Sequence, residues 1–281
     1  MKRSLLAGVT LILLVLGYGY WGAVRHPVVR HARIELPDWQ TDAILRVALL
    51  SDLHVAGPDM PPERLARIVE QVNTLKPDLV LIAGDLVSDK RISTHRYSEE
   101  EAVAPLVGLR ARHGVVAVLG NHDHWRDASG LRRALEANRI TVLSNSVIVR
   151  AGLVLAGADD DFTGRADPAA LVRAVAPLKG PVVTLSHSPD ITPALLPRFR
   201  LVLAGHTHCG QVALPLIGRP ATMSRYGDRF ACGLIREGER TIVIGAGLGT
   251  SVLPIRIGAP PDWWLLELTP RAAPATAAAA H

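Results

Sequence analysis

Residues 201–210 read LVLAGHTHCG, an apolar run that ends at Gly205 and is followed by His206 and His208. Two imidazoles placed two positions apart, just after a strand, point into the same crevice. Histidine pairs also occur in protein cores and on surfaces, so this pair alone does not establish a metal site. A metal site here requires further ligand residues elsewhere in the chain.

Four other apolar runs end in the same way, each at residue types that can bind a metal ion. Buried strands of a mostly parallel sheet read as short continuous apolar runs, and ligands bind outside their carboxyl ends. We therefore expect five strand ends to converge on one place. The other four ends carry Asp52 and His54 in LRVALLSDLH (45–54), Asp85 in DLVLIAGDL (78–86), Asn121 and His122 in VVAVLGNHDH (115–124), and His187 in PVVTLSHSP (181–189).

Composition bounds the class of protein. With 281 residues and 48% hydrophobic content the chain can bury a large core, and one α/β catalytic domain is expected over residues 41–270. The net charge of +5 favours an anionic partner. A specific nucleic-acid partner is not expected, because the sequence has no long Lys/Arg block. Cys209 and Cys232 are too few for a disulfide framework, and we do not expect a bond between them.

The first 24 residues predict a membrane anchor. Leu5 to Val24 carry no charge and, at 1.5 Å per residue, span about 30 Å, the core of one bilayer. Tyr18, Tyr20 and Trp21 suit an interfacial belt at the far end. A cleaved signal peptide is the alternative, but its apolar region is about 7 to 15 residues long and YWGA does not supply its cleavage site. Basic residues flank the segment on both sides, so the side that the domain faces stays open.

The rest of the chain predicts alternating strands and helices. Residues 25–40 are expected to be a linker and the entry to a sheet, with HARIEL (31–36) as an edge strand. The expected helices begin at Pro61, begin at the capping box of Ser98 and Glu101, run over Leu131 to Ala137, and begin after Asp167. The stretch 140–160 is expected to form antiparallel strands, and 230–245 further strands. Residues 263–268 are expected to close the sheet as its final strand, so that two half-sheets face each other. The tail, 271–281, is expected to be disordered.

The five strand ends together offer imidazole, carboxylate and amide ligands without a thiolate. Such a set suits Mn²⁺, Fe or Zn²⁺. A carboxylate between two sites can bridge two ions. Two cations about 3.5 to 4 Å apart hold the attacking and leaving oxygens of a displacement at phosphorus and acidify a bridging water. This chemistry predicts phosphoester hydrolysis.

The order of these motifs resembles that of the calcineurin-like metallophosphoesterases over about residues 47–208. The motifs are D-x-H (Asp52, His54), G-D (Gly84, Asp85), G-N-H-D (Gly120 to Asp123), a later lone histidine (His187) and G-H-x-H (Gly205 to His208). The resemblance implies a metal-dependent phosphoric ester hydrolase. It also implies a four-layer αββα sandwich of two mixed sheets, here preceded by an N-terminal transmembrane helix.

The resemblance further implies two divalent metal ions, with Mn²⁺ favoured, that share one bridging residue, Asp85. The first ion would be held by Asp52, His54, Asp85 and His208, and the second by Asp85, Asn121, His187 and His206. His122 would stabilise the transition state or protonate the leaving oxygen, with Asp123 orienting its ring. A His122 without a catalytic role is the alternative.

Three later stretches resemble the membrane-associated bacterial branch of that family, whose members act on phosphodiester or pyrophosphate bonds, including UDP-2,3-diacylglucosamine in lipid A synthesis. These stretches are GHTHCGQ (205–211), SRYGDRFACGL (224–234) and GLGTSVLPIRIG (247–258). The resemblance implies a lipid-linked or nucleotide-sugar substrate, a role in lipid metabolism, and a single pass through the bacterial cytoplasmic membrane. A phosphomonoesterase acting on proteins or small molecules, or a catalytically silent metal-binding scaffold, remains the alternative, and the oligomeric state stays open.

Two further groups of residues lie outside the motifs. Gly245, Gly247 and Gly249 lack the spacing of a dinucleotide-binding loop, so we expect a backbone that approaches the site closely. Arginines of the last third either bind substrate phosphates or lie solvated on the surface. These arginines are Arg225, Arg229 and Arg256.

Overall fold

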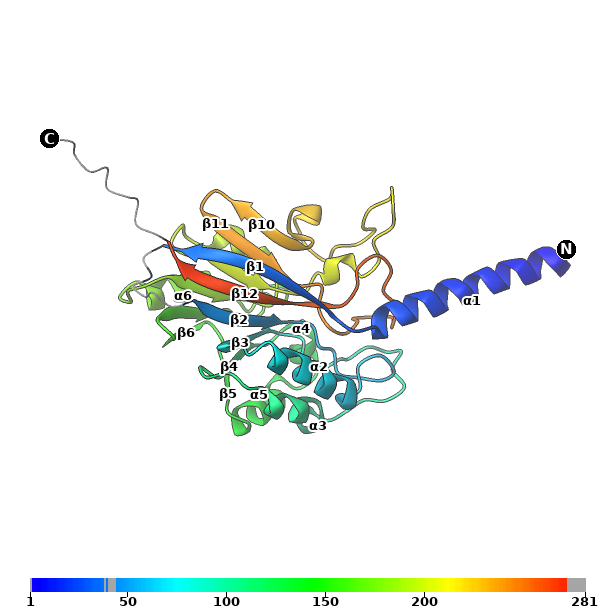
Figure 1. The fold of residues 1–281 in the computed structure, drawn as a ribbon, viewed down its shortest axis with the longest axis horizontal. Coiled ribbons are helices and arrows are strands. Elements are labelled where there is room, and N and C mark those ends of the chain that lie inside the picture. The colour runs from blue at the N-terminus through cyan, green and yellow to red at the C-terminus, as the bar shows by residue number, and fades with distance from the viewer. Residues whose placement is uncertain (1, 38, 40–43, 272–281) are drawn as a thin grey trace.

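The apolar runs form two six-stranded mixed sheets in the computed structural model, which describes residues 2–37, 39 and 44–271 (Figure 1). The expected disordered tail lies outside the described residues from 272 onward. Across the first sheet the order is β1 (Val28–Leu36), β12 (Asp262–Pro270), β2 (Leu45–Leu50), β3 (Leu79–Ala83), β4 (Val115–Val118) and β5 (Ile140–Val142). Across the second it is β10 (Gly233–Glu237), β11 (Arg240–Ile244), β9 (Leu201–Ala204), β8 (Val182–Leu185), β7 (Leu153–Gly157) and β6 (Ser146–Arg150). Neighbouring strands are parallel except in the pairs β12–β2, β10–β11 and β6–β7.

Helices cover the outer faces of both sheets. On the first sheet these are α2 (Pro62–Thr74), α3 (Glu99–Val103) and α5 (Ala128–Ala137), and on the second α6 (Pro168–Val175). The short α4 (Asn121–Trp125) follows β4, and α1 (Lys2–Val24) projects from the domain. Short 3₁₀ segments lie at Ala104–Gly108, Pro189–Ala194, His208–Gly210 and Gly227–Phe230.

Three apolar layers hold these elements together, because alternate residues of a strand face opposite sides of its sheet. In β3, Val80 and Ile82 pack under the helices, whereas Leu81 faces the second sheet. Leu155 and Leu203, from β7 and β9, lie in the same layer as Leu81. The layers therefore run helix, sheet, sheet, helix, and the predicted αββα sandwich is confirmed.

Most of the predicted elements are present, but two strand predictions are wrong in part. The stretch 140–160 divides between the sheets: β5 pairs parallel to β4, and only β6 and β7 form the expected antiparallel hairpin. The last strand, β12, does not close an edge but lies between β1 and β2. It occupies the interior because Trp263 packs in the helix-side layer and Trp264 in the layer between the sheets.

The last turns of α1 are docked on the domain, while the rest of the helix is exposed. The Gly19 carbonyl accepts a 2.9 Å hydrogen bond from the Arg256 backbone N–H. Arg64 donates to the carbonyls of Ala23 (3.0 Å) and Arg25 (3.1 Å). By length and composition α1 is able to cross a bilayer. The C-terminal end of this apolar helix is thus bound to the domain.

Substituting Gly22 should weaken the contact between α1 and the domain. A Cβ at Gly22 would lie 2.2 Å from the Arg256 carbonyl oxygen, whereas a Cβ at Gly17 meets no described atom within 4 Å. We expect Gly22→Ala to lower the unfolding free energy by about 1–3 kcal/mol, the usual cost of overpacking. Gly17→Ala is the matched control, since it changes helix propensity equally in the same helix. Thermal unfolding of the detergent-solubilised full chain, followed by tryptophan fluorescence, measures the difference, and equal midpoints would contradict the docking.

Candidate metal centre

The structure brings the seven predicted ligand side chains together at the carboxyl ends of five parallel strands. β2, β3 and β4 are neighbours in the first sheet, and β8 and β9 are neighbours in the second. The loops after these strands are tied to each other by backbone hydrogen bonds, from Asp52 N–H to the Gly84 carbonyl (3.0 Å) and from Gly205 N–H to the His187 carbonyl (2.9 Å). The seven residues are Asp52, His54, Asp85, Asn121, His187, His206 and His208.

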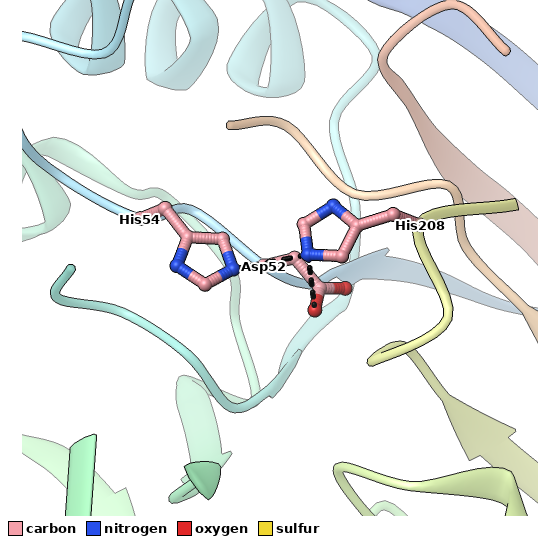
Figure 2. A group of neighbouring side chains, drawn as sticks. All are labelled: Asp52, His54 and His208. Carbon is pink, nitrogen blue, oxygen red and sulfur yellow. Dashed lines mark hydrogen bonds and ion pairs between the residues drawn. The ribbon is translucent and has the colours of Figure 1, made fainter. Parts of the chain in front are cut away.

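One group consists of Asp52, His54 and His208, whose side chains face one another (Figure 2). The Nε2 atoms of His54 and His208 are 3.0 Å apart. His208 Nε2 lies 3.6 Å from Asp52 Oδ1. The Asp52 carboxylate also accepts the backbone N–H of His206 (2.9 Å), which holds the loop after β9 against the loop after β2.

A second group surrounds His187. Its Nε2 lies 3.0 Å from Asn121 Oδ1 and 3.1 Å from His206 Nδ1. The other nitrogen of each ring has a backbone partner: His187 Nδ1 is 2.8 Å from the Ala83 carbonyl and His206 Nε2 is 3.2 Å from the Met223 carbonyl. These carbonyls can accept the ring N–H, and the opposite nitrogens, His187 Nε2 and His206 Nδ1, face the cluster.

Asp85 lies between the two groups. One oxygen, Oδ2, is 3.5 Å from His54 Nε2 and 3.2 Å from His187 Nε2. The other, Oδ1, accepts the backbone N–H of His122 (2.9 Å). Burial opposes ionisation of Asp85, but the neighbouring His187, His122 and His54 hold its pKa well below the usual range. This carboxylate is therefore a buried anion shared by both groups.

The buried imidazoles of His54, His206 and His208 are held neutral. Burial lowers the pKa of His206 to about 3 and keeps those of His54 and His208 well below the usual range. Burial also raises the pKa of Asp52 to about 6. His187 differs: burial alone would lower its pKa, but Asp85 raises it well above the usual value. Neutral imidazoles keep the lone pair that a metal ligand needs.

Several of these residues have left-handed backbone, which costs a non-glycine residue about 1–3 kcal/mol. The φ angles are 49° at Asp52, 46° at His54, 52° at Asp85, 69° at His206 and 50° at His208. The expectation of close backbone approach is confirmed: a Cβ at Gly247 would lie 2.5 Å from Asp52 Cβ, and one at Gly249 would lie 2.2 Å from the Leu53 carbonyl oxygen. The loops are strained and tightly packed around the side chains.

His122 lies at the open side of the cluster, with 13% of its side chain exposed. Asp89, not Asp123, contacts its ring, at Nδ1. Asp123 instead accepts the backbone N–H groups of Leu86 (2.8 Å), Val87 (3.0 Å) and Gly120 (2.9 Å). The predicted contact between Asp123 and the His122 ring is therefore wrong, because backbone donors already occupy both oxygens of Asp123.

Sequence reasoning missed Asp89 and two aromatic residues beside the cluster. Asp89 lies four positions after Asp85 in the same loop, a spacing with no recognisable period. Trp125 packs on His122 with ring centroids 4.9 Å apart, and Phe162 packs on His206 at 4.6 Å. Trp125 directly follows the G-N-H-D-H run, so its position gave a signal, whereas that of Phe162 did not. Both rings are exposed and form a nonpolar rim.

The three arginines have different surroundings. Arg256 is buried, and its guanidinium donates to the carbonyls of Ala246 and Gly249, both at 2.6 Å. It is therefore neither solvated nor placed to reach a substrate phosphate. The other two are exposed and lie beside carboxylates: Arg229 with Glu237, and Arg225 with Asp161 and Asp190.

Cys209 and Cys232 form a disulfide, with Cα atoms 4.7 Å apart, so the expectation that they stay unpaired is wrong. Cys209 follows His208 directly, and the bond closes the loop up to Cys232. This loop carries Met223, whose carbonyl accepts from His206. The crosslink therefore fixes a segment that supports the cluster.

The donor set fits divalent cations. Ligand atoms lie within 4.8 Å of one another in each of three groups: Asp52, His54 and His208; Asp52, Asp85 and His187; and His54, Asp85 and His122. His54 Nδ1 is buried and has no hydrogen-bond partner among the described residues. Nitrogen and oxygen ligands around a buried anion need a compensating positive charge, which a divalent cation supplies.

Comparisons with known proteins give a family and several relatives. A model of the "Calcineurin-like phosphoesterase" family matches residues 45–210. A "Transmembrane protein with metallophosphoesterase domain" from Danio rerio is 33% identical over 89% of this chain, and this chain spans only 58% of that relative. "Phosphodiesterase YaeI" from Escherichia coli (strain K12) is 29% identical over 95% of this chain and 98% of its own length. The solved 5'-nucleotidase precursor from Thermus thermophilus aligns at a TM-score of 0.47 and 17% identity, over 74% of this chain and 50% of that one.

Proposed function

This chain belongs to the calcineurin-like phosphoesterase family, a family of metal-dependent phosphoester hydrolases, and we propose that it hydrolyses phosphodiester or pyrophosphate bonds at a membrane surface. The observation that carries the proposal is the position of Asp85 Oδ2, which faces His54 on one side and His187 on the other. One carboxylate oxygen between two ligand groups suits a centre of two ions. Residues 41–270, together with β1, would form the catalytic domain.

The first ion would be held by Asp52, His54, Asp85 and His208, and the second by Asp85, Asn121, His187 and His206. When bound, the two ions supply a nucleophilic water and neutralise charge on the phosphoryl oxygens. The nitrogen and oxygen ligands suit Mn²⁺, Fe or Zn²⁺, and Mn²⁺ is our favoured choice. His187 and His206 are turned toward the centre by the carbonyls that accept their other N–H groups.

His122 would act on the leaving group. Its Nδ1 is held by Asp89, and its Nε2 points toward the cluster, 4.0 Å from Asp85 Oδ2. An imidazole held in this way protonates a leaving oxygen or stabilises its charge. Asp123 would support the reaction indirectly, because it accepts the backbone N–H of Leu86, which follows Asp85, and of Gly120, which precedes Asn121.

A lipid-linked or nucleotide-sugar substrate is our preferred class, with a molecule similar to UDP-2,3-diacylglucosamine as one example. The exposed rings of Trp125 and Phe162 offer nonpolar contact beside the cluster, which suits a substrate with an acyl chain or a base. The relative named as a phosphodiesterase supports diester chemistry. A phosphomonoesterase uses the same centre, and comparing turnover of diesters and monoesters separates the two. A silent scaffold is disfavoured because every expected ligand is present.

We infer that α1 stays attached as a membrane anchor. Cleavage after Ala23 would remove the Gly19 carbonyl from Arg256 and the Ala23 carbonyl from Arg64. A signal peptide that is discarded has no need of contacts with the mature domain. The relative from Danio rerio that is named as a transmembrane protein supports the same inference.

The domain would face the oxidising side of a bacterial cytoplasmic membrane. Disulfides such as Cys209–Cys232 persist in oxidising compartments and are rare in the cytosol. Lys2 and Arg3 would then stay inside, as the positive-inside rule requires. Large folded domains translocate largely regardless of their charge, so the basic residues after α1 do not oppose this orientation.

The bridging role of Asp85 predicts a double loss. Asp85→Asn should reduce metal content at both sites and lower kcat by about 10²-fold or more, since the shared negative charge is removed. Mass-spectrometric metal analysis after gel filtration, with circular dichroism as a check on folding, measures this. Asp228→Asn, at an exposed carboxylate, is the matched control and should change neither quantity. Two tightly bound ions in an active Asp85→Asn protein would rule the assignment out.

The role of His122 predicts a dependence on the leaving group. His122→Ala should retain both ions and lower kcat by about 10²-fold or more for a poor leaving group, but by less for p-nitrophenolate, which needs no proton. Asp89→Asn should show the same dependence with a smaller loss, because the ring stays but its partner is weakened. Equal losses for both leaving groups would assign His122 a different role.

The proposed orientation is tested with two C-terminal fusions of the full chain in bacterial cells. Alkaline phosphatase, which needs an oxidising compartment, should be active, whereas green fluorescent protein should be dark. Thiol alkylation of the extracted chain should label Cys209 and Cys232 only after reduction. A fluorescent fusion with reactive thiols would place the domain in the cytoplasm and contradict the inference.

A further inference from the structure

The candidate metal centre and the membrane helix lie at the same end of the domain. In Figure 1, the carboxyl end of β2 points toward the end from which α1 leaves. His54 follows β2, so the cluster lies on this side rather than on the opposite end, where β6 is labelled. If α1 spans a bilayer, this end of the domain faces the lipid.

The loop 251–258 holds α1 and thereby sets its depth. Gly19 packs on Ile255, since a Cβ at Gly19 would lie 2.3 Å from Ile255 Cγ2, and the backbone N–H of Arg256 donates to Gly19. Tyr18 and Trp21, whose rings are 5.7 Å apart, flank this contact. Tyrosine and tryptophan favour the headgroup level of a bilayer. If α1 spans a bilayer, these rings place the loop 251–258 at headgroup depth.

The part of α1 that is free of the domain is short. The stretch from Lys2 to Tyr18 is about 25 Å long at 1.5 Å per residue, whereas a bilayer core is about 30 Å thick. Short hydrophobic segments are accommodated by local thinning of the bilayer, by snorkelling of flanking residues or by oligomerisation. Local thinning would bring the lipid headgroups closer to the attached domain.

The first part of this loop, and a second turn beside it, expose large apolar side chains. Leu216 and Ile217 are 108% and 72% exposed, and Val252 and Leu253 are 66% and 42% exposed. The first pair lies at the tip of a turn closed by hydrogen bonds between Leu214 and Gly218. Exposed leucine and isoleucine at a turn tip are costly in water and favourable in a membrane interface.

The two turns are joined to each other and to the loop that holds α1. The Gln211 side chain donates to the Leu253 carbonyl (3.0 Å) and accepts the Ser251 N–H (3.1 Å). The backbone N–H of Ala213 donates to the Ile257 carbonyl (2.7 Å). The apolar tips are therefore continuous with the site where α1 is docked.

We propose that the turns 214–218 and 251–254 enter the interfacial region of the bilayer beside α1 and hold the catalytic edge against the membrane surface. This inference rests on the proposed membrane anchor. The occupant is lipid rather than a second protein, because the tips continue from a helix able to cross a bilayer and from its aromatic residues. The 209–232 loop, which includes the first turn, also carries the Met223 carbonyl that accepts from His206. A phosphoester at headgroup depth would then reach the centre while its apolar part stays in the leaflet.

Lipid contact is tested on the full-length chain reconstituted in phospholipid vesicles. Single cysteines at Ile217→Cys, Val252→Cys and Val149→Cys carry an environment-sensitive fluorophore, and lipids with a nitroxide on the acyl chain act as quenchers. The native cysteines are paired and do not react. Val149 is the matched control, because it is 60% exposed on β6, at the opposite end. We expect several-fold stronger quenching at 217 and 252 than at 149.

Equal quenching at all three positions would overturn the proposal. A blue-shifted emission at 217 without quenching by the nitroxide lipid would mean that protein, not lipid, covers the turn, and would also overturn it. The readout does not depend on catalysis, so the same measurement on Asp85→Asn protein separates this inference from the proposed hydrolytic function. Quenching retained in an inactive protein supports the membrane contact alone.

Discussion

The Asp85 carboxylate is the constraint on which the rest of the structure depends. It is buried as an anion where the two sheets meet, one oxygen facing His54 from the first sheet and His187 from the second. An isolated buried carboxylate would cost several kcal/mol, so the fold must deliver compensating groups to it. The parallel strand ends do so because their loops all leave the sheets at one edge. The sandwich is thus a means of bringing remote segments to one buried charge.

This arrangement requires an unfavourable backbone conformation at several residues of the site. Residues that leave a strand and immediately turn a side chain back over its end adopt positive φ, as Asp52, His54 and His208 do. Contacts between the loops hold this arrangement: the Asp52 carboxylate accepts the His206 N–H, and Asp123 accepts three backbone N–H groups from the loops after β3 and β4. A bound cation would add further stabilisation, since it binds the folded arrangement and not the unfolded chain. The strain is located where the chemistry is.

Most of the strands and the ligand cluster could be predicted from the sequence. Buried parallel strands leave continuous apolar runs, and polar residues directly after them mark the functional edge, which predicted the cluster. What the sequence could not show depends on contacts between distant segments. Asp89 contacts His122 because of the conformation of its loop. β12 lies between β1 and β2, with Trp263 and Trp264 buried on opposite faces of the strand. Cys209 meets Cys232 because the loop between them folds back. None of these leaves a periodic pattern.

Arg256 shows how closely the anchor and the centre are connected. Its backbone N–H binds the Gly19 carbonyl of α1, while its buried guanidinium lies 3.1 Å from His208 Nδ1 and donates to the carbonyl of Gly249. Burial lowers its pKa to about 10, so the guanidinium stays charged at neutral pH. A chain that lacks residues 1–24 would leave the Arg256 N–H without this acceptor. One residue thus connects α1 to the candidate metal centre, since Arg256 binds α1 through its backbone and contacts His208 through its side chain.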